Sequence, residues 1–245
     1  MNTLICETYE KMSEAAAAII AAQIMTKPHS VLGLATGSTP LGTYAELARL
    51  YREGTLNFEN VKSFNLDEYL GVGSSNDQSY SYFMMENLFN KINIDKANVK
   101  LLDGLTESPE NECKLFEELI KLAGGIDIQL LGIGINGHIG FNEPDSQFSM
   151  ATHLVRLAET TLNANSRFFK SVEEVPQFAL TMGIGTIMKA RKILVLASGE
   201  EKADIIRELV FGDIKPQTPA SVLRFHSSVT IITDRAAGAK IANRI

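Results

Sequence analysis

The stretch LLGIGINGHIGFNEP, residues 130–144, concentrates side chains that can move protons. It carries the imidazole of His138, the carboxylate of Glu143 and the amide of Asn136. An imidazole changes its charge near neutral pH, and a neighbouring carboxylate or amide can orient it for proton transfer. This combination indicates a loop that performs acid–base chemistry, with a purely structural histidine as the plainer alternative.

The glycines of the same stretch, Gly132, Gly134 and Gly137, also have the G-x-G-x-x-G spacing of a dinucleotide-binding loop. Such a loop requires the third glycine to open a helix whose N-terminus binds the pyrophosphate. Pro144 disfavours helical backbone at the residue before it, and Gly140 weakens a helix further. We therefore interpret these glycines as turn formers in a catalytic loop, not as a cofactor-binding motif.

Patterns for metal sites and serine nucleophiles are missing from the sequence. A zinc peptidase would need His-Glu-x-x-His, and an α/β-hydrolase would need G-x-S-x-G. The other histidines show no ligand spacing around His138, and the two cysteines form no metal pattern. The sequence gives no indication of a metal site.

A second group of chemical interest follows an apolar run in SFNLDEYLG, residues 63–71, where Asp67 and Glu68 have no lysine or arginine close in sequence. A carboxylate at the end of a buried strand can act as a general base if its pKa and geometry suit. The alternative, that Asp67 caps a turn, stays open on this evidence.

The stretch GLATGSTPLGTYAEL combines a strand, a turn of small residues, and Pro40 at an expected helix start. The turn formed by Gly37, Ser38 and Thr39 can direct backbone N–H groups and hydroxyls at one point near the positive end of the helix dipole, which suits an anion. It is not a nucleotide P-loop, because no Gly-Lys-Ser/Thr follows. An ordinary capped strand–helix turn is the alternative.

Lys202 and Arg167 are two cations that could serve an anion site, although a surface lysine without such a role, at a cost of roughly a few tenths of a kcal/mol, stays open for Lys202. Ser198 and Glu201 have capping-box spacing, and Lys202 falls near the first turn of the expected helix, where a cation opposes the dipole. Arg167 lies between polar residues and two phenylalanines. Because arginine can bind a phosphate bidentately and lysine adds a point charge, both could complete an anion site with the TGST turn.

The elements that must position these residues alternate along the chain. Apolar runs predict buried strands at residues 29–35, 61–66, 99–102, 126–133, 192–197 and 229–233. Amphipathic stretches predict helices at residues 9–25, 40–52, 78–91, 109–122, 199–210 and 234–243. This alternation indicates an α/β fold with a mainly parallel sheet, in which ligands bind at the loops after the strands.

Length and composition fit this fold. The 245 residues are 45% hydrophobic, which suits a single domain with a full core. A net charge of −6 argues against nucleic acid or an anionic membrane as a partner. The N-terminus lacks signal-peptide features, and no run reaches the roughly 18 apolar residues that a membrane span needs. We expect a cytoplasmic protein that acts on a small molecule.

Six stretches resemble glucosamine-6-phosphate deaminases in sequence and in order: LGLATGSTP, SFNLDEYLG, LLGIGINGHIGFNEP, NANSRFF, ALTMGIGTI and SGEEKA. The resemblance is to a short form of this family and covers nearly the whole chain; DEY and GHIGFNEP are its most specific parts. The related 6-phosphogluconolactonases typically read GHTASLFP where this chain reads GHIGFNEP. The resemblance implies a Rossmann-like three-layer fold, one domain over residues 1–245, and no metal or redox cofactor.

The same resemblance implies an activity in amino-sugar catabolism, the conversion of D-glucosamine 6-phosphate and water into D-fructose 6-phosphate and ammonia. Asp67 matches the base that carries a proton from C2 to C1. His138 matches the group that helps open the sugar ring, oriented by Glu143 and residue 136. The positions that match the substrate-phosphate site are Gly37, Ser38, Thr39, Arg167 and Lys202. A non-catalytic sugar-phosphate sensor and a lactonase-like hydrolase on the same fold are the alternatives.

Two features depart from the family pattern. Asn136 stands where many members carry aspartate, and it can orient His138 without offsetting an imidazolium charge. His153 and Val155 stand where long-form members carry the cations that bind an acetylated sugar phosphate, so we expect no such allosteric activation and a monomer or small homo-oligomer. Residues 146–170 are expected to form either a lid over the sugar or a fixed helical excursion.

Overall fold

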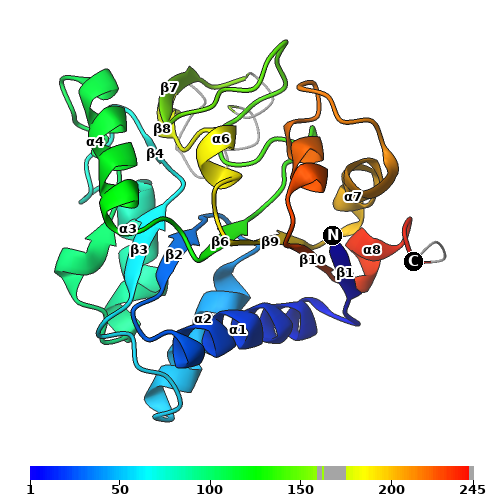
Figure 1. The fold of residues 1–245 in the computed structure, drawn as a ribbon, viewed down its shortest axis with the longest axis horizontal. Helices are drawn as coiled ribbons and strands as arrows, with labels where there is room; N and C mark the ends of the chain where they lie inside the picture. The colour runs from blue at the N-terminus through cyan, green and yellow to red at the C-terminus, as the bar shows by residue number, and fades with distance from the viewer. Residues whose placement is uncertain (159–161, 163–174, 243–245) are drawn as a thin grey trace.

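The computed structural model describes residues 1–158, 162 and 175–242 (Figure 1). Its centre is a sheet in which every neighbouring pair of strands is parallel. Across the sheet the strands run β1 (Asn2–Ile5), β10 (Val229–Thr233), β9 (Lys192–Ala197), β6 (Ile128–Leu131), β2 (Val31–Leu34), β3 (Lys62–Asn65) and β5 (Val99–Lys100). The central strands β2 and β6 are buried throughout, as their uninterrupted apolar sequences predict.

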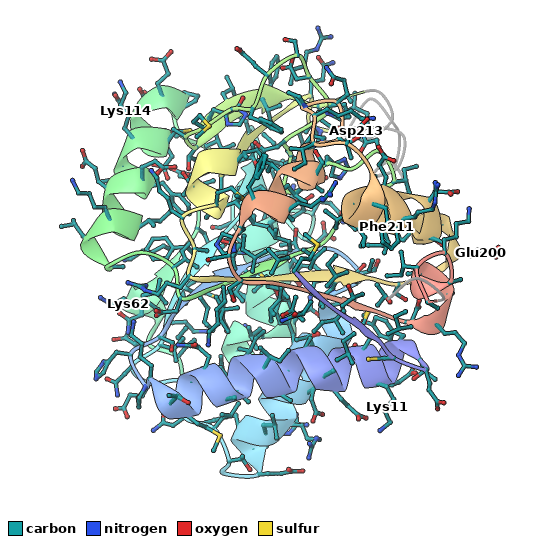
Figure 2. All side chains as sticks on the ribbon, turned by 45° about the vertical axis from the view of Figure 1, so that its right-hand side comes forward. Lys11, Lys62, Lys114, Glu200, Phe211 and Asp213 are labelled. Carbon is teal, nitrogen blue, oxygen red and sulfur yellow. The ribbon has the colours of Figure 1, made fainter. Side chains whose placement is uncertain are left out.

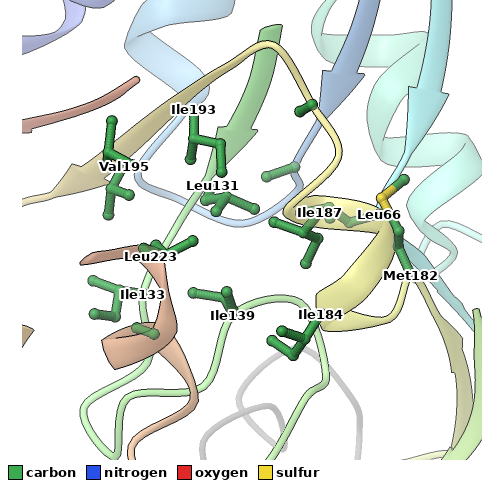
Figure 3. Packing of buried hydrophobic residues seen from close by; sticks show 14 of the residues in the cluster. Leu66, Leu131, Ile133, Ile139, Met182, Ile184, Ile187, Ile193, Val195 and Leu223 are labelled. Carbon is green, nitrogen blue, oxygen red and sulfur yellow. The ribbon is translucent and has the colours of Figure 1, made fainter. Parts of the chain in front are cut away.

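Helices cover both faces of this sheet, which makes the predicted three-layer α/β fold (Figure 1). One face packs against α1 (Tyr9–Thr26), α2 (Leu41–Arg52) and α3 (Tyr80–Asn87). The other packs against α4 (Pro109–Leu122), α6 (Ile184–Ile187), α7 (Ala203–Phe211) and α8 (Arg235–Gly238). Figure 3 shows Leu131 and Val195 of the sheet facing Leu223 and Ile184 across this second interface. Charged side chains such as Lys11 on α1 and Lys114 on α4 lie around the outside (Figure 2).

The order of the strands creates a switch point between β2 and β6. After β2 the chain moves outward to β3 and β5, whereas after β6 it moves the opposite way to β9 and β10. The loops that leave β2 and β6 therefore diverge at the carboxyl ends of the strands, and ligands of such sheets bind beside a switch point of this kind.

A second, three-stranded antiparallel sheet lies beyond this edge, and the sequence patterns did not predict it. Its strands are β4 (Asp67–Tyr69), β8 (Phe178–Thr181) and β7 (His153–Arg156), in that order. The Cα of Asp67 pairs with that of Thr181. Asp67 thus opens a strand of the second sheet, instead of ending β3 as predicted.

Other predicted elements need correction. The predicted helix over 234–243 appears as the four-residue α8 within the described residues. The helix predicted at 199–210 begins at Ala203, after a 3₁₀ turn. The capping box was wrong, because the Ser198 hydroxyl donates instead to Asp234 (2.5 Å), which caps α8. Strand β1 was missed.

The segment 146–170 is only partly described. Residues 153–156 form β7, and most of the remainder after Ala158 lies outside the described residues. Its role as a lid stays a prediction. Among the described residues, no helix has both the length and the apolar character that a membrane span requires, and a cytoplasmic location also stays a prediction.

Candidate active site

Four neighbouring strands, β9, β6, β2 and β3, carry the predicted site residues on or near the segments that follow them. Because parallel strands end at the same edge, the β2–α2 turn, Asp67, the loop after β6 and Lys202 gather at one end of the sheet. Arg167, the remaining predicted residue, lies outside the described residues.

Tyr9 of α1 holds the turn at Gly37, Ser38 and Thr39 through its hydroxyl group. The Tyr9 hydroxyl approaches the carbonyls of Ser38 (3.2 Å) and Thr39 (3.1 Å), and it accepts the N–H of Gly42 (2.8 Å). Gly37 has a φ of +99°, which favours glycine there. Within the described part of the chain, no acceptor binds the backbone N–H groups of the turn. Exposed, unpaired amides beside the start of α2 are suited to an anion such as a phosphate.

Lys202 lies at the same edge, at the N-cap of α7. Its ammonium group donates to the carbonyl of Ile133 (2.8 Å), in the loop that follows β6. The cation therefore sits close to the loop that carries Asn136, His138 and Glu143, at the carboxyl end of the sheet.

The loop after β6 is shaped by its glycines around one buried anchor. Ile139 is fully buried in the core, next to His138 in sequence (Figure 3). The Gly134 N–H donates to the His138 carbonyl (2.9 Å), and a Cβ at Gly134 would lie 2.4 Å from the imidazole. Gly137 has a φ of +88° and opens no helix. The interpretation of the glycines as turn formers is confirmed.

Asn136, His138 and Glu143 meet within this loop. The Asn136 amide donates to Glu143 Oε2 (3.0 Å), while Asn136 Oδ1 accepts the backbone N–H of His138 (3.1 Å). The same Glu143 oxygen lies 3.4 Å from His138 Nδ1, within ion-pair distance but outside good hydrogen-bond geometry. Catalytic hydrogen bonds often shorten only when substrate binds, so this arrangement can orient an imidazole for proton transfer.

Asp67 is a buried carboxylate at this edge of the sheet, and its pKa is raised. Its side chain is 6% exposed, and no group in the described ranges donates a hydrogen bond to it. Burial, and secondarily the neighbouring Glu68 carboxyl, raise the pKa of Asp67 to about 8. A carboxylate with a raised pKa and unoccupied oxygens is a stronger base than an ordinary aspartate. The alternative that Asp67 caps a turn finds no support in these contacts.

Glu68, the next residue, has a structural environment instead. It accepts backbone N–H groups from Tyr69 (2.9 Å), Tyr80 (2.9 Å) and Ser81 (2.8 Å), the last two at the start of α3. The carboxylate oxygens of Glu68 are therefore occupied by backbone N–H groups, two of which belong to the start of α3. The sequence could not distinguish the two carboxylates, because the difference depends on which side of β4 each one faces.

The loop and Asp67 lie against each other. A Cβ placed at Gly140 would lie 2.9 Å from Thr181 Oγ1 and 3.7 Å from Asp67 Oδ2. The Phe141 N–H donates to the Thr181 hydroxyl oxygen (3.0 Å), and the Asn142 amide donates to the Met182 carbonyl (2.9 Å). Sequence reasoning missed Thr181 and Met182 as site neighbours, although both fall in the ALTMGIGTI stretch that carries the family resemblance.

The structure thus brings Asp67, the His138 loop, the Gly37–Thr39 turn and Lys202 to one edge of the sheet. In the described residues, no three His, Cys, Asp or Glu side chains gather in a way that could hold a metal ion.

Comparisons with known proteins agree with this arrangement. The model of the family "Glucosamine-6-phosphate isomerases/6-phosphogluconolactonase" matches residues 6–232. A glucosamine-6-phosphate deaminase of Clostridioides difficile is 54% identical over 241 residues, covering 98% of this chain and 97% of the relative. One from Clostridium acetobutylicum is 56% identical over 237 residues, covering 97% and 98%.

Solved structures extend the comparison to the fold. A structure described as a monomeric glucosamine-6-phosphate deaminase superposes with a TM-score of 0.96 at 46% identity, covering 98% of this chain and all of the other. The 6-phosphogluconolactonase of Leishmania guyanensis shares the fold, with a TM-score of 0.78 at 23% identity and 98% coverage of both chains. The chain belongs to the family of glucosamine-6-phosphate isomerases and 6-phosphogluconolactonases.

Proposed function

We propose that this protein converts D-glucosamine 6-phosphate and water into D-fructose 6-phosphate and ammonia. The observation that carries the proposal is the buried Asp67, free of hydrogen-bond donors in the described structure, against which the His138 loop lies. Relatives more than 50% identical over nearly the whole chain are named for this reaction. The lactonase is less supported, because the solved lactonase structure is 23% identical to this chain, whereas the solved deaminase is 46% identical.

Substrate binding begins with the phosphate. We assign it to the amides and hydroxyls of Gly37, Ser38 and Thr39, with Lys202 and, from the family resemblance, Arg167 as cations. A dianion at unpaired amides by a helix start needs little rearrangement of the protein. Binding energy from this remote group then holds the sugar carbons at the catalytic residues.

Ring opening requires a proton to move from the anomeric hydroxyl to the ring oxygen. We assign this transfer to His138, because an imidazole can accept and donate near neutral pH. Glu143 faces its Nδ1, and Asn136 fixes both Glu143 and the His138 backbone. We assign to Asn136 the role of orienting His138, through its own side-chain amide.

Isomerisation and deamination follow on the open chain. Ionised Asp67 removes the proton from C2 while the substrate's ammonium group gives a proton to O1, so that an enolamine forms; the same carboxyl then returns its proton to C1 to give an iminium at C2. Water adds to C2 and ammonia leaves, so that a ketone remains. The substrate's ammonium group near Asp67 favours the ionised carboxylate and offsets part of the burial that raises its pKa.

An assay with three parallel readouts tests the proposal. Purified protein is given glucosamine 6-phosphate while fructose 6-phosphate and ammonia are measured together, then 6-phosphogluconolactone, and binding of the amino sugar is followed by calorimetry. Equimolar release of both products supports the deaminase. Binding without products would favour a sensor, and turnover of the lactone alone would favour the lactonase; either result would overturn the proposal.

A further inference from the structure

We propose that Thr181 is a positioning residue for this reaction: its hydroxyl holds the His138 loop in register with Asp67. This inference rests on the proposed function. The two catalytic groups reach the site from different sheets, since His138 follows β6 of the parallel sheet and Asp67 opens β4 of the antiparallel sheet. A contact between the two segments must therefore fix the distance between His138 and Asp67.

Thr181 belongs to the same three-stranded antiparallel sheet as Asp67. It is the last residue of β8, fully buried, and its Cα pairs directly with that of Asp67. Directly opposed residues of an antiparallel pair place their side chains on the same face. The Thr181 hydroxyl oxygen and Asp67 Oδ2 accordingly lie 2.9 Å and 3.7 Å from one point, the position of a Cβ at Gly140.

On the side of the loop, the Thr181 hydroxyl accepts the backbone N–H of Phe141 (3.0 Å). This bond is buried, so its loss would leave an amide without water to replace the acceptor. The Phe141 ring packs against Tyr69, the third residue of β4, with ring centroids 5.7 Å apart. The loop therefore docks on the strand of the base through one hydrogen bond and one aromatic contact.

The adjacent residue, Met182, ties the same region to the main sheet. Its N–H donates to the Leu66 carbonyl (2.7 Å), directly before Asp67, and its own carbonyl accepts the Asn142 amide (2.9 Å). The second of these hydrogen bonds, donated by the Asn142 side chain, restrains the position of the loop. The Thr181 hydroxyl adds a hydrogen bond to Phe141, the residue after Gly140, where a φ of +57° and the absence of a Cβ allow the loop to approach Thr181 and Asp67 closely.

Such a contact acts on turnover more than on binding. A displacement of about 1 Å between reacting groups can cost about 10²-fold in rate. The phosphate turn follows β2 of the parallel sheet, and among the described residues no hydrogen bond joins it to Thr181, so KM should depend little on this hydroxyl.

The test compares four variants with wild type for kcat and KM on glucosamine 6-phosphate and for melting temperature. Thr181→Val removes the hydroxyl at nearly constant shape, and Thr181→Ser keeps it. Thr233→Val is the matched control, because Thr233 is also fully buried, ends a strand, and has a hydroxyl without a partner. Thr181→Ala, paired with Thr181→Ser, isolates the hydroxyl if the valine variant does not fold.

We expect Thr181→Val to lower kcat about 10- to 100-fold with KM within about threefold of wild type, as for a misplaced catalytic group. Thr181→Ser should restore most of kcat, and Thr233→Val should match wild type. Wild-type kcat in Thr181→Val, or equal losses in the serine and alanine variants, would overturn the inference and leave the proposed function intact. An inactive wild-type protein would instead overturn both.

Discussion

The turn at Gly37–Thr39 and the loop at Asn136–Glu143 follow adjacent strands of one sheet, yet they are built in opposite ways. The turn exposes backbone amides to solvent and rests on a single tyrosine, Tyr9. The loop is anchored by the buried Ile139 and clamped by Thr181 and Met182. One segment offers unpaired donors, and the other holds side chains in fixed positions.

The difference follows from what each task requires. An incoming anion needs N–H groups that have no partner, and such groups can remain unpaired only where water reaches them. Proton transfer needs a base of raised pKa at a fixed distance, which requires burial and a rigid surround. The two segments should therefore respond differently to substitution: loop and base variants should change kcat, and anion-site variants should change KM.

The largest effect is expected from Asp67→Asn, which removes the proposed base and keeps its shape. We expect kcat to fall about 10³-fold or more, because one positioned base contributes about 10²- to 10⁴-fold to the rate. KM should stay within about threefold. Asp77→Asn, at an exposed loop, is the control. A kcat within tenfold of wild type would remove Asp67 from the mechanism.

Replacing the imidazole should have the next largest effect. For His138→Gln we expect a loss of about 10²-fold in kcat, since ring opening can proceed slowly without catalysis. The control is His29→Gln, which changes an exposed histidine. If steady-state kinetics show a change in KM alone, His138 would belong to substrate binding and the contrast between the two segments would weaken.

The opposite response is expected from the anion site. Lys202→Met removes a charge that we assign to phosphate binding. We expect KM to rise about tenfold, because this is what the loss of one charge-assisted hydrogen bond costs, while kcat stays within about threefold of wild type. Lys114→Met on the outer side of α4 serves as the control (Figure 2). A fall in kcat at constant KM would place Lys202 with the catalytic loop, to which it is bonded through Ile133.

The smallest and most diagnostic change is Asn136→Asp. The Asn136 amide now donates to Glu143 at 3.0 Å, and the substitution puts a carboxylate oxygen in its place. When two carboxylates lie so close together, the pKa of one of them is raised. We expect the acidic limb of the kcat/KM profile to move to higher pH by about one unit, with the maximal rate nearly kept. Superimposable pH profiles would show that residue 136 acts through geometry alone.

The parallel sheet and its helices could be predicted because their signals are local. Strands β9 and β10 and helix α4 have the predicted bounds, since each is a continuous apolar or amphipathic run between clear breakers. The small sheet gave no such signal. Strand β4 has three residues, and β7 is not buried on either face, so neither shows a buried apolar run.

The residue types of the site were also readable, but their geometry was not. The sequence indicated an imidazole loop, a carboxylate pair and an anion turn, and the structure brings all three to one edge. It could not indicate that Asp67 is unpaired and Glu68 is engaged, or that Thr181 lies opposite Asp67. The first fact depends on how the start of α3 packs against Glu68, and the second depends on pairing between strands far apart in the chain.

The most direct test of the central claim is the fate of hydrogen at C1. The reaction is run in deuterium oxide to low conversion, and the fructose 6-phosphate is analysed by NMR. If Asp67 alone carries the proton from C2 to C1, each product molecule contains at most one deuterium at C1, always in the same one of the two C1 positions. Equal labelling of both positions would show delivery from solvent without a fixed base and would contradict the account.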